Sequence, residues 1–312
     1  STEHAGAVEK FAVQYQADGS AKVTDPRGML STRAYQSILG VRKATSIADS
    51  CANCLAHNFA YSYDTNGRID ARIDPNSVIT EYVRDIRGLA TERKDAASLA
   101  SERTIQTDWD ISLSLPIERR TYDSSNTFVA KSAWTYNARG QALTATQTDP
   151  VTGSTRVTTT SYCESGDITV GTCPLLGLVT SINGPRTDVA DTTTYAYYAS
   201  DDATCVSSPT ICPYRKGDLW KVTDALGRVT ETLAYDGAGR VLSVKDANGV
   251  ITDLEYHPRG WLTTRKVRGT NNAAETDDQI TQIEYWPTGL VKKVIQPDGA
   301  FTAYTYDAAH RL

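Results

Sequence analysis

The stretch Thr223–Leu262, TDALGRVTETLAYDGAGRVLSVKDANGVITDLEYHPRGWL, contains one pattern twice. Two short phrases alternate along it, Asp-x-x-Gly and Tyr-Asp-x-x-Gly-Arg, and a run of strand-forming residues separates each phrase from the next. The turn-opening positions 224, 236, 246 and 257 are 12, 10 and 11 residues apart, a spacing typical of successive antiparallel hairpins. The stretch therefore predicts short strands joined by tight turns.

The residues of each phrase suit a tight turn. An aspartate at the first position accepts hydrogen bonds from the backbone amides that follow it. A glycine three residues later can adopt the left-handed conformation that closes a four-residue hairpin loop, often with a bulge. Between the turns, Val229, Glu231, Leu233 and Tyr235 fall on one face of an extended chain. This period of two, in a run rich in β-branched residues and tyrosine, predicts strand rather than helix.

The phrases recur over most of the 312 residues. Residues 1–58 are irregular, whereas 59–312 form clear repeats, interrupted by loop excursions near 94–104, 163–173, 199–216 and 270–278. The intervals from Tyr235 to Tyr256 and from Tyr285 to Tyr306 are both 21 residues. A period near twenty, built from strands and turns, predicts a single all-β repeat array. Because the pattern runs to the last residue, whereas a terminal repeat is normally atypical, we expect a segment of a longer array.

Composition narrows the function classes. The formal net charge is −5 and no basic run occurs, which argues against nucleic acid as the main partner. No apolar stretch approaches the ~18 residues needed to span a membrane. The first ten residues, STEHAGAVEK, lack the basic and apolar regions of a signal peptide. Either export uses another route or the chain is a piece of a longer one. The 17 tyrosines against 4 phenylalanines favour amphipathic sheet surfaces over a thick apolar core.

Six cysteines are present, an even number. Cys163 and Cys173 close one short polar segment, and Cys205 and Cys212 close another. These pairs are interpreted as local disulfides that pin excursions from the sheet, which implies an oxidising compartment. The alternative is reduced, buried thiols in a cytosolic chain.

The third pair, Cys51 and Cys54, is a candidate disulfide or a pair of free thiols. With His57 it supplies three of the ligands that zinc uses, but no fourth ligand is evident nearby, so no metal site is assigned. A thioredoxin-like role would require a βαβ context that the sequence lacks.

No catalytic site or cofactor is assigned either. Most aspartates open turns, where the carboxylate has a structural task. No G-x-S-x-G, Walker or H-E-x-x-H pattern occurs. Tyrosines and tryptophans could stack on sugars, and four tryptophans lie beside turns. Cross-strand packing, with the tyrosine ring on the sheet and its hydroxyl reaching a polar partner, accounts for them more simply. These tryptophans are Trp134, Trp220, Trp261 and Trp286.

The phrases resemble the RHS or YD-repeat family, which is named for its Tyr-Asp dipeptide. The matching turn residues are Tyr63, Asp64 and Gly67; Asp224 and Gly227; Tyr235, Asp236 and Gly239; Asp246 and Gly249; and Tyr306 and Asp307. Individual repeats depart from the pattern: Asn137 and His257 replace the aspartate, and His310 replaces the glycine. The resemblance covers roughly residues 60–312 and rests on its recurrence.

The resemblance implies a wide β-sheet that spirals into part of a hollow shell. Similar bacterial shells hold the C-terminal toxin of polymorphic toxins and toxin complexes used in bacterial competition, and teneurins carry more distant ones. The expected function is a non-enzymatic shell segment, secreted or at the bacterial cell surface, that encapsulates and helps deliver a toxin. Expected partners are the toxin or the remaining shell, with secretion machinery as a further possibility. The alternative is an adhesion or carbohydrate-binding module that contacts surface glycans.

Overall fold

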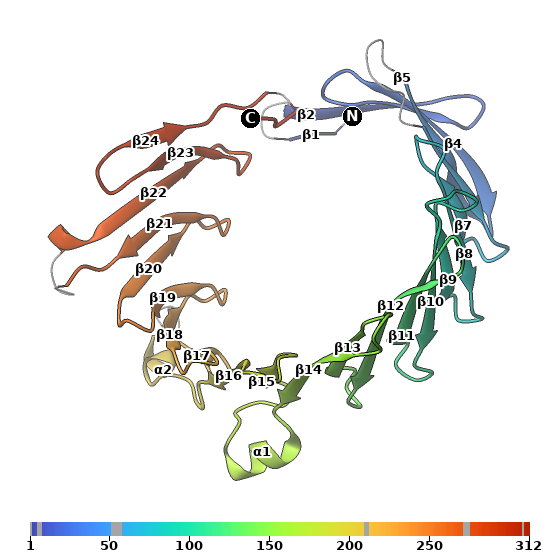
Figure 1. The fold of residues 1–312 in the computed structure, drawn as a ribbon. Helices are drawn as coiled ribbons and strands as arrows, with labels where there is room; N and C mark the ends of the chain where they lie inside the picture. Colours follow the sequence, from blue (N-terminus) through green and yellow to red (C-terminus); the bar gives the residue numbers. More distant parts are fainter. Residues whose placement is uncertain (1, 5–7, 51–57, 209–211, 271–274, 308) are drawn as a thin grey trace. The chain divides into compact units, whose positions relative to one another are not determined.

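The computed structural model describes residues 2–4, 8–50, 58–208, 212–270, 275–307 and 309–312. The described chain is almost entirely antiparallel β-sheet, with strands β1 to β24 in chain order (Figure 1). It divides into two compact units, of which unit 1 comprises 1–135, 145–155 and 306–312, and unit 2 comprises 136–144 and 156–305. One of the points at which the chain passes between the units lies within β13 (Ala142–Thr148).

Unit 1 is a series of hairpins. Each strand from β6 to β12 pairs antiparallel with the one before it. The strands are β1 (Thr2–His4), β2 (Val8–Tyr15), β3 (Ala21–Thr24), β4 (Leu30–Ile38), β5 (Val41–Ser50), β6 (Asn58–Tyr63), β7 (Ile69–Ile73), β8 (Ile79–Arg84), β9 (Ala90–Asp95), β10 (Arg103–Trp109), β11 (Pro116–Asp123) and β12 (Phe128–Tyr136). The irregular N-terminal sequence thus also forms hairpins, and the excursion near 94–104 is reduced to the turn 96–102.

Unit 2 continues the same arrangement from β14 to β24. Among the described residues of this unit, short helices occur in the longer connections: α1 (Ser165–Val170), α2 (Thr204–Ser207) and the 3₁₀ turn η2 (Glu275–Asp277). The strands are β14 (Thr155–Tyr162), β15 (Val179–Asn183), β16 (Thr192–Tyr197), β17 (Leu219–Thr223), β18 (Val229–Tyr235), β19 (Val241–Lys245), β20 (Ile251–Tyr256), β21 (Leu262–Val267), β22 (Gln279–Tyr285), β23 (Val291–Ile295) and β24 (Phe301–Ala303). The prediction of an all-β array of antiparallel hairpins is confirmed.

Alternate connections of such a meander lie on opposite edges of the sheet. We call one edge the tyrosine rim, because most strands that reach it end on tyrosine. In unit 2 it comprises the connections 137–141, 163–178, 198–218, 236–240, 257–261 and 286–290. The opposite edge, the aspartate rim, comprises 184–191, 224–228, 246–250, 268–278 and 296–300.

A β-bulge recurs where strands meet the tyrosine rim. Glu284 pairs with Lys293, but the next residue, Tyr285, pairs with Val291, which leaves Lys292 unmatched. The same shift occurs at the ends of β6, β8, β14, β16 and β20. In β18 the irregularity begins earlier, between Thr232 and Ala234, so the simple alternation expected through Leu233 to Tyr235 is wrong. An extra residue on one strand bends and twists the pair locally.

The sheet has little core beneath it. Seven apolar residues are buried among those described, and four of them are the cysteines 163, 173, 205 and 212. The accessible surface is 19351 Å². A compact monomer of this mass would expose about 12,800 Å². Most strand residues are instead half-buried by their neighbours within one layer.

Candidate functional site: the tyrosine rim

The turn 236–240 shows how the aspartate organises a hairpin. Asp236 Oδ1 accepts hydrogen bonds from the backbone amides of Ala238 (2.9 Å) and Arg240 (3.0 Å). The Asp236 amide donates to the Arg240 carbonyl at 2.9 Å, and Gly239, at φ +79°, donates to the Asp236 carbonyl. One carboxylate oxygen therefore replaces water at two amides that the hairpin itself leaves unpaired.

The other aspartates of the repeat phrases make the same pair of bonds. Asp64, Asp224, Asp246 and Asp307 each accept from the amides two and four residues later, at 2.8 to 3.0 Å. The glycines Gly67, Gly227 and Gly249 have φ between +73° and +86°. Tyr63, Tyr235 and Tyr306 immediately precede their turns, so the turn residues named from the sequence all lie in one recurrent geometry.

Departures from the phrase preserve this geometry. Asn137 Oδ1 accepts from the amides of Arg139 and Gln141, both at 3.0 Å. His257 Nδ1 accepts from the Arg259 amide at 3.1 Å. His310 occupies the glycine position at φ +59°. These departures keep an acceptor at the first position and a left-handed residue at the fourth. The turn 286–290 keeps only the latter, since Trp286 opens it and Gly289 has φ +89°.

The second carboxylate oxygen often binds the arginine that follows the glycine. Asp224 and Asp307 hold Arg228 and Arg311 at 2.6 and 2.7 Å (Oδ2 to Nε). The Arg228 amide, and then its guanidinium, lower the pKa of the Asp224 carboxyl. The corresponding bonds from Arg311 lower the pKa of Asp307 to about 2. The carboxylates are therefore turn acceptors held in the ionised state.

Tyrosine hydroxyls join each repeat to the one before it. The Tyr235 hydroxyl donates to the carbonyl of Leu219 at 2.7 Å, and the Tyr285 hydroxyl to that of Leu262 at 2.8 Å. Burial raises the pKa of both hydroxyls, so both remain protonated donors. Four further bonds of this kind run from Tyr63 to Ala44, from Trp109 (indole Nε1) to Ala90, from Tyr162 to Ala142 and from Tyr197 to Val179.

The acceptor has a defined place in the fold. In five of these six bonds it is the first residue of the preceding strand, just past the previous tyrosine-rim connection. The aromatic side chain thus spans two strands that belong to different hairpins on this rim. A hydroxyl that satisfies a strand-end carbonyl in this way contributes about 1 kcal/mol.

Residues that follow the turn glycines reach forward to the next turn. Arg240 Nη1 donates to the His257 carbonyl at 3.3 Å, and its guanidinium lies 4.8 Å from the centre of the Tyr256 ring. Gln141 Nε2 donates to the Gly177 carbonyl at 2.8 Å. The ring of Trp261 lies beside Gly289, within 3.0 Å of where a Cβ would stand. Each repeat on this rim therefore contacts both the preceding and the following repeat.

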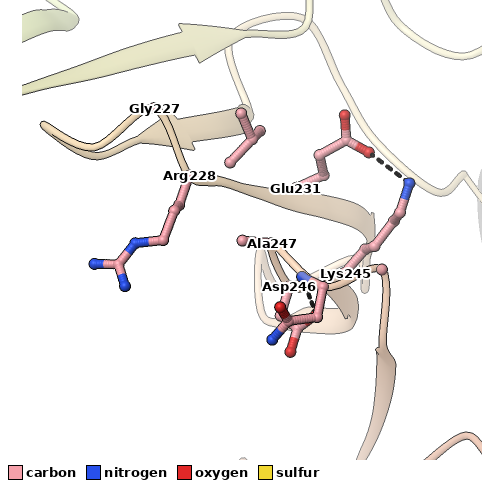
Figure 2. Close-up of a pocket in the computed structure, with 9 residues that line it drawn as sticks. Gly227, Arg228, Glu231, Lys245, Asp246 and Ala247 are labelled. Carbon is pink, nitrogen blue, oxygen red and sulfur yellow. Dashed lines mark hydrogen bonds and ion pairs between the residues drawn. The ribbon is translucent and has the colours of Figure 1, made fainter.

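The aspartate rim lacks this close contact. No atom lies within 4 Å of a Cβ built on Gly227, Gly249 or Gly299. On the tyrosine rim this holds for Gly239, whereas Gly177, Gly217, Gly260 and Gly289 each have a side chain of another connection within 4 Å. An open pocket separates the turns 224–228 and 246–250 (Figure 2). On its wall Glu231 pairs with Lys245 at 3.8 Å and with Lys221 at 2.8 Å, and the lysines lower the pKa of the Glu231 carboxyl. On this wall the charges of Glu231 and Lys245 are therefore paired with each other.

The cysteines of both excursions are bonded in the structure. Cys163–Cys173 and Cys205–Cys212 form disulfides with Cα–Cα distances of 5.8 and 4.4 Å. Cys51, Cys54 and His57 lie outside the described residues. Among the described residues, no group of three His, Cys, Asp or Glu side chains is arranged to hold a metal ion. In the same part of the chain no helix has the length and apolar character needed to cross a membrane.

The bonds between repeats were not expected from the sequence. Their donors and acceptors are 16 to 23 residues apart. The one available signal was compositional, because 17 tyrosines against 4 phenylalanines indicate that the hydroxyl is needed.

These features define a class: a one-layer antiparallel β-repeat protein whose hairpins are joined along one rim. The RHS repeat family model matches residues 215–250, 235–271 and 285–312. These matches include the turns that open at positions 224, 236, 246 and 257 and the last one, at Asp307. Residues 215–271 and 285–312 thus match the RHS repeat, which confirms the resemblance seen in the Tyr-Asp phrases.

Three solved structures are similar to this chain. A Photorhabdus luminescens Tc holotoxin pore aligns at 16% identity and TM-score 0.40, over 95% of this chain and 16% of that one. TcdB2-TccC3 aligns at 15% and 0.40, over 96% and 19%. A porin-like protein from Bacteroides uniformis aligns at 11% and 0.32, over 83% and 94%.

This chain spans less than a fifth of the first two structures. Because these TM-scores are 0.40 or lower, no argument about the fold is drawn from the three similarities. No curated protein matches the chain.

Proposed function

We propose that this chain is a non-enzymatic wall segment of an RHS-repeat shell that encloses a C-terminal toxin and helps to deliver it. One observation carries the proposal: the sheet is a single layer that exposes 19351 Å². A catalytic domain positions its groups on a packed core, whereas a wall needs two solvent-facing surfaces and firm connections between neighbouring strands. The tyrosine rim supplies such connections.

A wall that contains a polypeptide requires firm contacts between its successive hairpins. Each hydroxyl-to-carbonyl bond and each arginine that reaches the next turn hold successive hairpins in register. The ion-paired wall residues, such as Glu231 with Lys221 and Lys245, keep a sheet surface polar without unpaired charge. Both properties suit a surface that borders an unfolded or partly folded polypeptide without binding it tightly. The partners proposed are therefore that toxin and the rest of the shell.

A location outside the bacterial cytoplasm, secreted or at the cell surface, is part of the proposal. Two disulfides in the described residues support it, because such bonds persist in oxidising compartments.

The test uses the natural full-length gene product. A toxin shell predicts that the polypeptide C-terminal to the repeats resists protease in the intact protein and is cleaved rapidly when expressed by itself. Equal cleavage rates in both settings would contradict containment.

The alternative, a glycan-binding module, is favoured by one observation. Trp220 and Trp286 are 37% and 38% exposed, and lysine ammonium groups lie 3.9 and 5.5 Å from their ring centres. Saturable binding on a glycan array that is lost in Trp220→Ala and Trp286→Ala variants would support this function instead of containment.

A further inference from the structure

The tyrosine rim of unit 2 is continuous, and its middle is formed by two disulfide-closed loops instead of tight turns. The first loop, 163–178, is contacted by the preceding turn of the rim, 137–141. Arg139 forms two hydrogen bonds with the Glu164 carboxylate, at 2.7 and 2.8 Å, and Gln141 binds the Gly177 carbonyl. The Gly177 amide in turn donates to the carbonyl of Cys163 at 2.9 Å. Gly177, which the preceding turn contacts through Gln141, is therefore hydrogen-bonded to one residue of the Cys163–Cys173 disulfide.

The second loop, 198–218, contacts the first loop and then the next strand. The side chain of Leu175, in the first loop, lies against Gly217, at a distance that leaves no room for a Cβ there. The loop then contacts the following strand, because the Tyr235 amide donates to the Pro213 carbonyl at 2.6 Å. Tyr235 immediately precedes the next turn of the rim, 236–240. Both loops thus occupy places that tight turns fill elsewhere.

The Cys205–Cys212 disulfide sets the position of these contacts. Sγ of Cys205 and Sγ of Cys212 lie 3.4 and 3.3 Å from the carbonyl oxygen of Tyr214. The Tyr214 ring stacks on Tyr198, with centroids 3.6 Å apart, and the Tyr198 hydroxyl donates to the Thr232 carbonyl at 2.8 Å. Pro213 and Tyr214 follow Cys212 directly, so the disulfide restrains Pro213, which contacts β18, and Tyr214, which stacks on the other residue that contacts it, Tyr198.

We propose that the two disulfides are redox-sensitive clamps of the tyrosine rim, closed in an oxidising compartment and opened by a thiol reductant. To reduce one of these disulfides, two thiol groups of the reductant supply two electrons and are themselves oxidised to a disulfide. Their two protons pass to the two cysteine sulfurs of the protein. The S–S bond breaks and no backbone bond changes. The freed loops regain the conformational entropy that a ten-residue or seven-residue closure removes.

The opening is expected to be confined to one rim. The pairs Thr223–Val229 and Lys245–Ile251, beside the aspartate rim, are held by the strand ladder and by turns that contain no cysteine. Reduction therefore loosens the wall along the rim where its repeats are joined. This inference concerns the wall itself and stands apart from the proposed containment.

Hydrogen exchange resolved to single amides tests the proposal on the whole chain, oxidised and after treatment with dithiothreitol. Labelling with a maleimide, followed by mass spectrometry, measures how many cysteine thiols have been freed. The amides of Tyr198, Gly217 and Tyr235, which bond to rim-loop carbonyls, should exchange on the order of tenfold faster after reduction. The amides of Val229 and Ile251 should exchange at an unchanged rate.

A Cys205→Ser/Cys212→Ser double variant should show the same faster exchange at Gly217 and Tyr235 without reductant. Addition of dithiothreitol to it should then affect only the first loop. Unchanged exchange in a chain with fully labelled thiols would overturn the proposal. Equal acceleration at both rims would do so too, because it would show that the disulfides hold the whole sheet and not one rim.

Discussion

The hydroxyl of Tyr285 donates a hydrogen bond to the carbonyl of Leu262 at 2.8 Å, across two strands whose hairpins are consecutive repeats. The bond places the ring of Tyr285 5.3 Å (centroid to centroid) from Trp261, which itself lies against the next turn glycine, Gly289. Tyr285 and Trp261 thus connect two successive turns of the tyrosine rim, 257–261 and 286–290. Stability of this one-layer sheet is therefore concentrated in contacts between repeats, as expected for repeat proteins.

Removal of a single rim hydroxyl should weaken the wall measurably. Tyr235→Phe keeps the ring but loses the bond to the Leu219 carbonyl, so we expect a loss of about 1 kcal/mol in the free energy of unfolding by urea. Tyr15→Phe is the control, since the Tyr15 side chain is 81% exposed. A loss no larger than that of the control would show that the hydroxyl contributes nothing.

Two turn glycines should differ in their tolerance of alanine. Gly249 and Gly289 have nearly the same φ, +86° and +89°, so alanine meets the same backbone strain of about 1 kcal/mol at each. At Gly289 the new Cβ also meets the Trp261 ring at 3.0 Å, whereas at Gly249 it meets no atom within 4 Å. Urea unfolding should therefore show Gly289→Ala to be less stable than Gly249→Ala by about 1 kcal/mol. Equal losses would contradict the turn-to-turn contact.

Two arginines at equivalent turn positions should also differ. Arg228 is 65% exposed and binds its own turn, whereas Arg240 is 30% exposed and also reaches the His257 carbonyl and the Tyr256 ring. We expect Arg240→Ala to cost about 1–2 kcal/mol and Arg228→Ala at most about 0.5 kcal/mol in thermal or urea unfolding. The reverse order would place the important contact within the turn and not between turns.

Acid should loosen the turns before it affects the strands. The folded-state pKa of Asp307 is lowered to about 2 and that of Asp224 is also lowered, whereas an unfolded aspartate titrates near 3.9. A depressed pKa contributes stability that is present above about pH 4 and is lost as the pH falls through the folded-state pKa, toward about pH 2. Hydrogen exchange of the turn amides over this range measures the effect.

Asp224→Asn is the matched variant for the acid prediction. Asparagine keeps an oxygen acceptor, as Asn137 does with the amides of Arg139 and Gln141, but it cannot be ionised. The variant should form the turn at neutral pH, and exchange at the Leu226 and Arg228 amides should no longer accelerate as the pH falls from 4 to 2. Persistence of the full acid response in the variant would assign it to other groups.

Local chemistry made the hairpins predictable. The turn of Asp224 and Gly227 depends on a side chain and amides that are at most four residues apart, so the phrase carries all its determinants. The same holds for Cys205 and Cys212, which are separated by seven positions. The β-bulge near Leu233 was missed because it arises from the pairing of β18 with β19, and composition does not reveal pairing register.

The sequence by itself determined the class of fold, because a repeated phrase of turn residues and alternating strands admits an antiparallel array and little else. Only the tertiary structure decided which rim joins the repeats. A tyrosine hydroxyl and a carbonyl about one repeat earlier meet because bulges and strand register place them together. The part that the disulfide loops play in that rim was also decided by the tertiary structure. Each disulfide closes a local loop, but the contacts of Leu175 with Gly217 and of Pro213 with Tyr235 depend on neighbouring hairpins.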